Sequence, residues 1–365
     1  REKSLFRCLI PGYTERKSFM VEQVEKRIWE RLFKWCKSLA GITVIATVVI
    51  ALLATLDRGG YVLVNTVVTG GMTALVAMGL ALTLGVLNIP MFAHGEYFMI
   101  GSLTAYYVFT PINTYITANP DSSLVFLGPL ITIVAAMVVG ALVGVASEVL
   151  VFSQLRKRSR ENWVMNSFLL TVGLSVVLIN AHQLFFGADF KGITRYWAGM
   201  PISIMDVFIS RDRAMSFALA AIVVVVFWFF MTYTRTGRAI RAVSQDENGA
   251  LMVGIGLKGI LLLTMSLSCA LAAIAGASLL FMYPAYPSVG LEPLYMAWFV
   301  VILSGLGNVL GAVMGAFMVA LLKVLTIEYI GSGWDFVVPS ALIIVVLIFK
   351  PSGIFGSEVR GILDK

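Results

Sequence analysis

The chain has 365 residues, of which 59% are hydrophobic and 13% charged, with a mean hydropathy of +0.91. Soluble domains are about 45–50% apolar and about 25% charged. This composition disfavours a cytosolic enzyme, a nucleic-acid-binding domain and a disordered tail, because none of them could keep so much apolar surface away from water. The net charge of +7 therefore indicates basic loops at a membrane surface, not nucleic-acid binding.

The N-terminal region at 1–38 is the only long charged segment, with ten Lys or Arg and five Asp or Glu. From Met20 to Leu39, apolar residues recur at spacings of three and four, which predicts an amphipathic helix. This helix would lie in the headgroup plane or dock on a partner; the alternative is a soluble tail with a chance periodicity. We expect a cytoplasmic or interfacial extension.

Ten apolar segments follow. They are too long and too uniformly apolar for strands, and helices satisfy their own backbone groups in lipid. We therefore expect an all-α, polytopic transmembrane helix bundle of about eight to ten membrane segments, some short or broken. It would occupy 39–356 and leave a cytoplasmic tail at 357–365. The segments are 39–56, 61–87, 94–110, 124–152, 163–185, 214–233, 259–282, 294–304, 309–330 and 336–349.

Basic loops predict the orientation. With the N-terminus inside, the basic residues at 156–160 and 235–241 fall on the cytoplasmic side, as the positive-inside rule requires. The C-terminus returns to that side after the tenth segment. The loop at 186–213 carries four basic residues on the outside, which departs from the rule. We expect a multi-pass protein of the inner or plasma membrane, in contact with the lipid bilayer, with both termini cytoplasmic.

The run at 61–87 is interrupted at Asn88 and Pro90. Directly afterwards, His94 and Glu96 place ionisable groups in an apolar stretch, where such groups are costly. They either line a substrate path or cap and brace the broken helix. Two positions apart in a helix, they do not share a face and do not form a coupled acid and base. The predicted path includes Asn88, Met91, Phe92, His94 and Glu96.

A charged loop at 234–254 joins two membrane segments. Its basic residues, small residues and following acidic turn favour a short helix on the membrane surface that fits a groove of a soluble partner. The alternative is an ordinary basic loop. The candidate coupling residues are Arg235, Thr236, Gly237, Arg238, Arg241, Ala242 and Gly254.

A second interruption follows the short run at 294–304. Paired breaks in a membrane protein point to a transport site near the midplane, where freed backbone groups can bind a small zwitterionic or amide solute. For Gly307, Gly311 and Gly315, spaced four apart, close helix packing is the alternative. The predicted path residues at this break are Ser304, Gly305, Gly307 and Asn308.

Catalytic and metal-binding signatures are missing from the sequence. The two histidines lie far apart, and no serine elbow or metal-ligand spacing occurs. The sequence also lacks G-x-x-x-x-G-K-[ST], the P-loop that holds ATP phosphates. We therefore expect neither an enzyme nor a metal or cofactor site on this chain.

Five stretches occur in a recognisable order: AHGE at 93–96, the loop at 234–254, AAIAG at 272–276, SGLGNVLGA at 304–312 and KPSGIFG at 350–356. Over 61–356 the chain resembles the permeases of branched-chain amino-acid ABC transporters. Met91 stands where that family usually has asparagine, and Ser304 where it usually has glycine. The N-terminal 60 residues have no counterpart that we can place.

The resemblance implies a membrane subunit of an importer for branched-chain or other small amino acids. This subunit would be paired with a second homologous permease, two cytoplasmic ATPases that carry ATP and magnesium, and an extracytoplasmic solute-binding protein. The loop at 234–254 would be the segment received by an ATPase. An importer of urea or short-chain amides shares the same motifs and is one alternative. Others are an ATP-independent secondary transporter with Glu96 or Glu148 as ion relay, and a purely structural membrane subunit.

Overall fold

The computed structural model describes residues 39–119, 122–158, 162–197, 199–204 and 207–356. The amphipathic helix predicted within 1–38 and the tail at 357–365 lie outside these residues. Contacts divide the chain into two units, 1–50 and 51–365. Of the first unit, only the beginning of one helix is described. The second unit contains the remaining elements and is described by itself below.

The described residues are almost entirely helical. The long helices are α2 (Leu39–Arg58), α3 (Tyr61–Leu82), α4 (His94–Ala118), α5 (Leu124–Ser147), α7 (Trp163–Phe186), α8 (Arg211–Tyr233), α11 (Leu257–Ser278), α12 (Leu291–Ser304), α13 (Val309–Tyr329) and α14 (Val337–Phe349). The short ones are α6 (Ser153–Arg158), α9 (Arg235–Gln245), α10 (Glu247–Met252), the π-helical η1 (Thr83–Leu87) and η2 (Glu148–Phe152), and the 3₁₀ turn η3 (Ser332–Trp334). An antiparallel hairpin pairs β1 (Ile202–Ile204) with β2 (Val207–Ile209), Ile202 opposite Ile209.

Eight helical stretches within the described residues are long and apolar enough to cross a membrane. This confirms the predicted all-α polytopic bundle. The eight stretches are Gly41–Arg58, Tyr61–Leu87, Leu124–Arg158, Trp163–Phe186, Arg211–Tyr233, Leu257–Ser278, Val309–Tyr329 and Ser332–Phe349. The apolar helix α12 is shorter, with 14 residues.

Two helices extend further than their apolar runs. Helix α4 continues past Pro111 to Ala118, and threonine hydroxyls there bond to carbonyls one turn back, as Thr114 does to Thr110 O at 3.1 Å. Helix α5 continues through η2 into α6 and ends at Arg158. Hydropathy misses both extensions because polar or charged residues lower the mean hydropathy of these stretches, although their backbone hydrogen bonds continue the helix.

Small residues at the centre of the second unit allow α4 and α5 to approach α11 closely. A Cβ on Gly101 of α4 would collide with the backbone of Ala273, and one on Gly144 of α5 would lie 2.8 Å from Cys269 Cβ. The run at 272–276 is buried between these helices. Close backbone approach at small residues is the usual packing mode of membrane helices.

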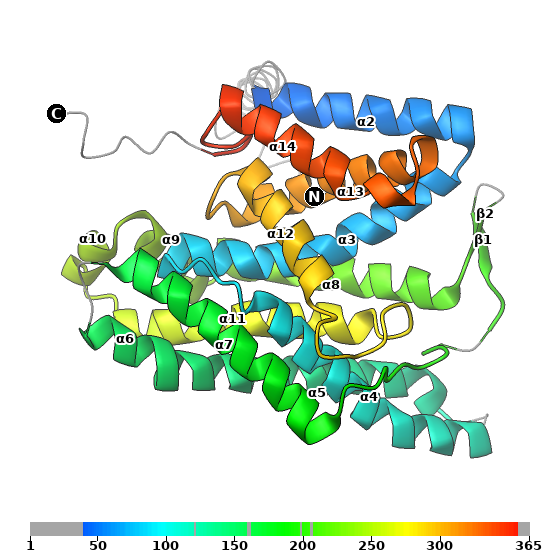
Figure 1. The fold of residues 1–365 in the computed structure, drawn as a ribbon, viewed down its shortest axis with the longest axis horizontal. Coiled ribbons are helices and arrows are strands. Elements are labelled where there is room, and N and C mark those ends of the chain that lie inside the picture. The colour runs from blue at the N-terminus through cyan, green and yellow to red at the C-terminus, as the bar shows by residue number, and fades with distance from the viewer. Residues whose placement is uncertain (1–38, 120–121, 159–161, 198, 205–206, 357–365) are drawn as a thin grey trace, which may run out of the picture. The chain divides into compact units, whose positions relative to one another are not determined.

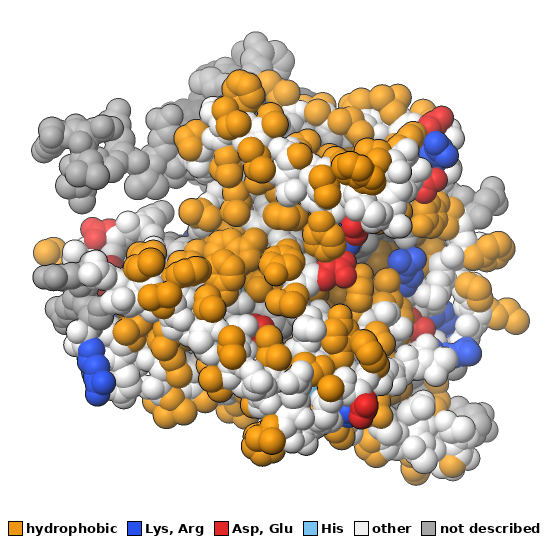
Figure 2. All heavy atoms as spheres, in the orientation of Figure 1, with side chains coloured by type: hydrophobic (Ala, Val, Ile, Leu, Met, Phe, Trp, Pro, Cys, Tyr) orange, Lys and Arg blue, Asp and Glu red, His pale blue; other side chains and the backbone are white. Residues whose placement is uncertain are grey.

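The second unit has two distinct ends. Helices α6, α9 and α10 lie at one end, left in Figure 1, and the β1–β2 hairpin lies at the other. We call these the α9 end and the hairpin end. Figure 2 shows hydrophobic side chains over the middle of the visible face, with most of the red and blue side chains towards the hairpin end. Apolar side chains stay exposed along the helices, as at Leu142 (61%) and Ile222 (63%). Such a belt suits lipid.

Replacing Gly101 by alanine should destabilise the bundle. Overpacking a filled core costs about 1–3 kcal/mol, more than the ~1 kcal/mol that alanine gains over glycine in a helix. We expect the midpoint of thermal unfolding, followed by tryptophan fluorescence in detergent, to fall by several degrees. The matched control is Gly173→Ala on α7, where a Cβ meets nothing within 4 Å. Equal midpoints for the two variants would contradict the packing role.

Candidate functional site

The first break, between η1 and α4, is held by side chains of α7. Asn88 adopts the left-handed conformation at φ 54°, which asparagine tolerates better than most residues, and it ends η1. Trp163 Nε1 donates to Leu87 O at 3.0 Å. Thr171 Oγ1 donates to Pro90 O at 3.0 Å and accepts from Phe92 N at 3.3 Å. The interrupted backbone therefore finds its partners on a neighbouring helix.

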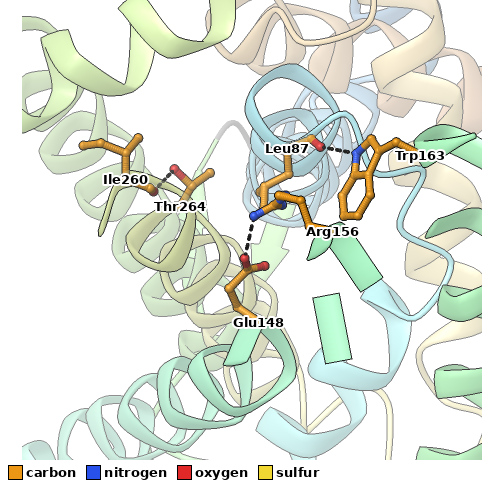
Figure 3. A network of polar contacts seen from close by, with 6 residues as sticks. All are labelled: Leu87, Glu148, Arg156, Trp163, Ile260 and Thr264. Carbon is orange, nitrogen blue, oxygen red and sulfur yellow. Dashed lines mark hydrogen bonds and ion pairs between the residues drawn. The ribbon is translucent and has the colours of Figure 1, made fainter. Parts of the chain in front are cut away.

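Figure 3 shows the polar contacts beside this break. Arg156 Nη1 lies 2.9 Å from Glu148 Oε1, and the Arg156 guanidinium stacks over the Trp163 ring, 4.7 Å from its centroid. Trp163 in turn points its ring nitrogen at Leu87 O. Glu148 is only 4% exposed. Glu148 is thus a buried carboxylate paired with Arg156, and through Arg156 it ties η2 to the start of α7.

The two ionisable residues after the break are buried. His94 Nε2 lies 3.1 Å from Val76 O, so the histidine joins the start of α4 to the middle of α3. Glu96 Oε1 accepts a hydrogen bond from Ser175 Oγ of α7 at 2.7 Å. Phe92 packs against Phe168 of α7 and Trp298 of α12, with ring centroids 5.2 Å away in both cases. Met91 is fully buried.

The second break, between α12 and α13, is covered by the segment that follows α14. Asn308 caps α13, its Oδ1 accepting from Gly311 N at 2.9 Å, while its Nδ2 donates to Phe355 O at 2.9 Å. Ile354 N donates to Leu303 O at 2.8 Å, and Phe355 N donates to Ser304 O at 3.2 Å. Gly305 has φ 98°, and a Cβ there would press on Gly356 and Ser352. The glycine is required by both conformation and space.

The two breaks meet through η1. A Cβ added at Gly85 would lie 2.7 Å from Gly307 Cα, so η1 and the second break are in backbone contact. Gly307 itself has φ 79°. His94 and Glu96 are not drawn into this contact, because their hydrogen bonds go to α3 and α7. The predicted path residues therefore fall into two groups instead of converging on one cavity.

A groove of about 1240 Å³ opens between α3, α8, α9, α13 and the segment after α14; we call it the α9-end groove. Its walls are mainly apolar, and Arg241, Gln245 and Lys350 are among its polar lining. Of the predicted path residues, Gly307 and Asn308 line it. The lining as described does not include Asn88, Met91, Phe92, His94, Glu96, Ser304 or Gly305.

Helix α9 turns away from α8 at a tight joint. Thr234 caps α9, its Oγ1 accepting from Gly237 N at 2.9 Å, and Gly237 presses on the backbone of Met231 so closely that a Cβ would not fit. Ile240 and Val243 are buried. Arg235, Arg238 and Arg241 are exposed, whereas Thr236 and Ala242 are half-buried. The helix thus has one face fixed on the bundle and one basic face outward.

The loop predicted as one short helix consists of two. Asp246 separates them because its side chain accepts from Asn248 N at 3.0 Å and starts α10, as aspartate does at helix N-termini. Three exposed apolar residues stand at the end of α10 and directly after it: Leu251 (51%), Met252 (88%) and Val253 (77%), which we call the apolar tip. Gly254 follows with φ 82°. The tip was not predicted, because its three apolar residues lie in a charged loop and are too few to form an apolar run.

Among the described residues, no group of three or more His, Cys, Asp or Glu side chains could hold a metal ion.

The proteins to which the chain is similar are membrane transport permeases. The Pseudomonas aeruginosa high-affinity branched-chain amino acid transport system permease protein BraD is 30% identical over 299 residues, 80% of this chain and 94% of the relative. The corresponding Escherichia coli K12 protein, LivH, is 27% identical over 297 residues, with the same coverage. A probable branched-chain amino acid transport permease protein LivH of Methanocaldococcus jannaschii is 24% identical over 307 residues, 81% of this chain and 92% of the relative.

No solved structure matches the chain. The model of the family described as the branched-chain amino acid transport system permease component matches residues 62–347. This range contains both helix breaks, α9, α10 and the core around α11, and it confirms the predicted resemblance. The chain therefore belongs to the family of branched-chain amino acid transport system permease components.

Proposed function

We propose that this chain is the permease subunit of an ATP-binding-cassette importer for branched-chain amino acids. It works with a second homologous permease, two ATPase subunits and an extracytoplasmic solute-binding protein. It spans the inner or plasma membrane with both termini and the α9 end in the cytoplasm, which agrees with the basic residues of α6 and α9. The names of its relatives support transport of branched-chain amino acids.

The observation that carries the proposal is the apolar tip beside the basic face of α9. Met252 and Val253 are 88% and 77% exposed in a charged loop, where apolar side chains gain by leaving water. Arg235 and Arg238 stand exposed on the adjoining helix. An ATPase with an apolar pocket and acidic rim would cover both features.

Helix α9 can transmit movement to the membrane helices. Its buried face contacts η1 and α11, and its joint to α8 is tight at Gly237. A pull on α9 therefore reaches the end of α3 beside the first break. Because η1 contacts Gly307, the second break moves with it. ATP and magnesium are held by the partner ATPases, since the chain has no P-loop.

The solute route follows the seam between α3 and α13. The α9-end groove is lined by Met78 and Leu82 of α3 and by Val313 and Met314 of α13. Gly307 and Asn308 bring polar groups to the same wall. Behind the seam, Asn88, Met91, Phe92, His94 and Glu96 hold the start of α4, while Ser304 and Gly305 hold the second break. Except for Asn88, which is exposed, their buried or half-buried contacts favour a bracing role over direct solute contact.

Removing the apolar tip should release the ATPase. Burying an apolar side chain contributes about 1.5–3 kcal/mol, so replacing both Met252 and Val253 by serine should weaken the contact at least about tenfold. We expect the amount of ATPase co-purifying with the chain to fall accordingly, as measured by quantitative immunoblot. Met200→Ser serves as control, because Met200 is 83% exposed in the segment between α7 and β1. Undiminished co-purification with normal stimulated hydrolysis would refute the docking role.

Reversing the basic face of α9 should stop transport. In Arg235→Glu with Arg238→Glu, two attractive charges become repulsive, and we expect ATP-driven leucine uptake into proteoliposomes to fall below about one tenth. Arg195→Glu, an exposed arginine between α7 and β1, should leave uptake within about twofold. Normal uptake in the double variant would contradict the coupling. Uptake of urea but not leucine, or uptake without ATP, by the unaltered complex would contradict the proposed function itself.

A further inference from the structure

A second cavity, of about 70 Å³, lies towards the hairpin end between α3, α4, α8, α12, α13 and the segment that follows α11; we call it the hairpin-end cavity. Much of its wall is apolar and includes three methionines, Met72, Met282 and Met296. Three charged side chains also line it: Arg213 of α8, Glu292 of α12 and Lys323 of α13. Placing charged side chains in an apolar wall costs free energy, and in membrane proteins such side chains commonly mark a functional site.

Lys323 stands between two carboxylates. Its Nζ is 2.7 Å from Glu292 Oε1 and 3.6 Å from Asp335 Oδ2, and its side chain is 12% exposed. The ammonium also lies over the Phe336 ring, 5.1 Å from the centroid. Lys323 can therefore keep one carboxylate partner when the other turns away.

Arg213 has no carboxylate partner among the described residues. Its Nη1 donates to the neutral amide oxygen of Asn65 at 3.2 Å, and its buried Nε has no hydrogen-bond partner. A guanidinium presents a fork of donors that matches a carboxylate. A half-buried arginine with an unused donor in a cavity wall is therefore suited to receive an anionic group.

Tyr283 shows that these charges share one neighbourhood. Burial raises the pKa of its phenol, and the nearby carboxylate of Glu292 raises that pKa further. Lys323 and Arg213 lower the pKa of Tyr283, and Asp335 again raises it. Two cations and two anions thus act on one hydroxyl at the rim of the cavity. Their formal charges cancel.

We propose that the hairpin-end cavity binds the zwitterion of a free aliphatic α-amino acid, with Arg213 on its carboxylate, Glu292 on its ammonium and the methionines around its side chain. This rests on the proposed function and names the place where the permease first holds the solute. When the solute ammonium takes Glu292, Lys323 stays with Asp335. No charge is left unpaired.

Electroneutrality gives the cavity its selectivity. A zwitterion adds no net charge to four charges that already cancel, whereas an acid or amine with one charge would leave a partly buried ion without a partner. The methionine wall favours aliphatic side chains, and its unbranched, flexible side chains can move apart to enlarge the small cavity. Both features match a branched-chain amino acid better than urea, which has no charge.

The cavity also lies on the proposed route. Met72 and Val76 of α3 and Val319 of α13 line it, and the same two helices line the α9-end groove further along. The two helices are in close contact along this seam, because Phe317 of α13 packs on Gly70 of α3, where a Cβ would be too close for the ring. A solute released from the hairpin-end cavity would follow one continuous seam.

The test uses the complete importer in proteoliposomes with its solute-binding protein saturated with leucine. Arg213→Gln and Glu292→Gln should each lower ATP-driven leucine uptake per assembled complex at least tenfold, while hydrolysis stays stimulated by the loaded binding protein. The matched controls are Arg211→Gln, two residues earlier on α8, and Glu328→Gln on α13; neither residue is among those that line the cavity. Both controls should stay within twofold of the unaltered complex.

Uptake per complex unchanged in Arg213→Gln and Glu292→Gln would overturn this proposal and leave the proposed function standing. Loss of ATP dependence in the unaltered complex would instead overturn the proposed function. If Arg213→Gln fails to assemble, Arg213→Lys replaces it, because lysine keeps the positive charge and loses the forked donors of the guanidinium. It should assemble and transport at an intermediate rate; full uptake would overturn the carboxylate role.

Discussion

Backbone groups released by a helix break need partners, because no water is available inside an apolar bundle to take their place. At the first break, Trp163 and Thr171 of α7 donate to the carbonyls of Leu87 and Pro90, and Thr171 accepts from the amide of Phe92. At the second, the segment after α14 donates amides to Leu303 O and Ser304 O. These hydrogen bonds decide where α4, α7 and the C-terminal segment lie, and the close contact of Gly85 with Gly307 joins both regions.

Much of the fold could be predicted because hydropathy and backbone satisfaction act locally. All ten apolar runs correspond to helices, and both interruptions, at Asn88 and at 305–308, separate helices in the structure. Helix ends were less predictable, since α4 extends past Pro111 on hydroxyl-to-carbonyl hydrogen bonds that hydropathy does not measure. The β1–β2 hairpin and the division of the loop at Asp246 depend on local turn and capping geometry and were missed.

The candidate site was harder to predict, because partners across the bundle decide the role of a polar residue. His94 and Glu96 stand out in the sequence, yet their hydrogen bonds go to α3 and α7. Asn308 stands out as well, but its side-chain amide caps α13 through Gly311 N and donates to Phe355 O. Arg213, in contrast, looked like one more basic residue in an outside loop. Its unused donor becomes visible only when five helices enclose it.

The hydrogen bonds that the segment after α14 makes to the second break have a consequence for biosynthesis. Leu303 and Ser304 receive their amide partners from Ile354 and Phe355, which are translated about fifty residues later. Until α13 and α14 have been inserted, the carbonyls at the end of α12 have no such partner. The backbone at the second break can therefore gain these partners only after the helices before and after it have already been inserted into the lipid.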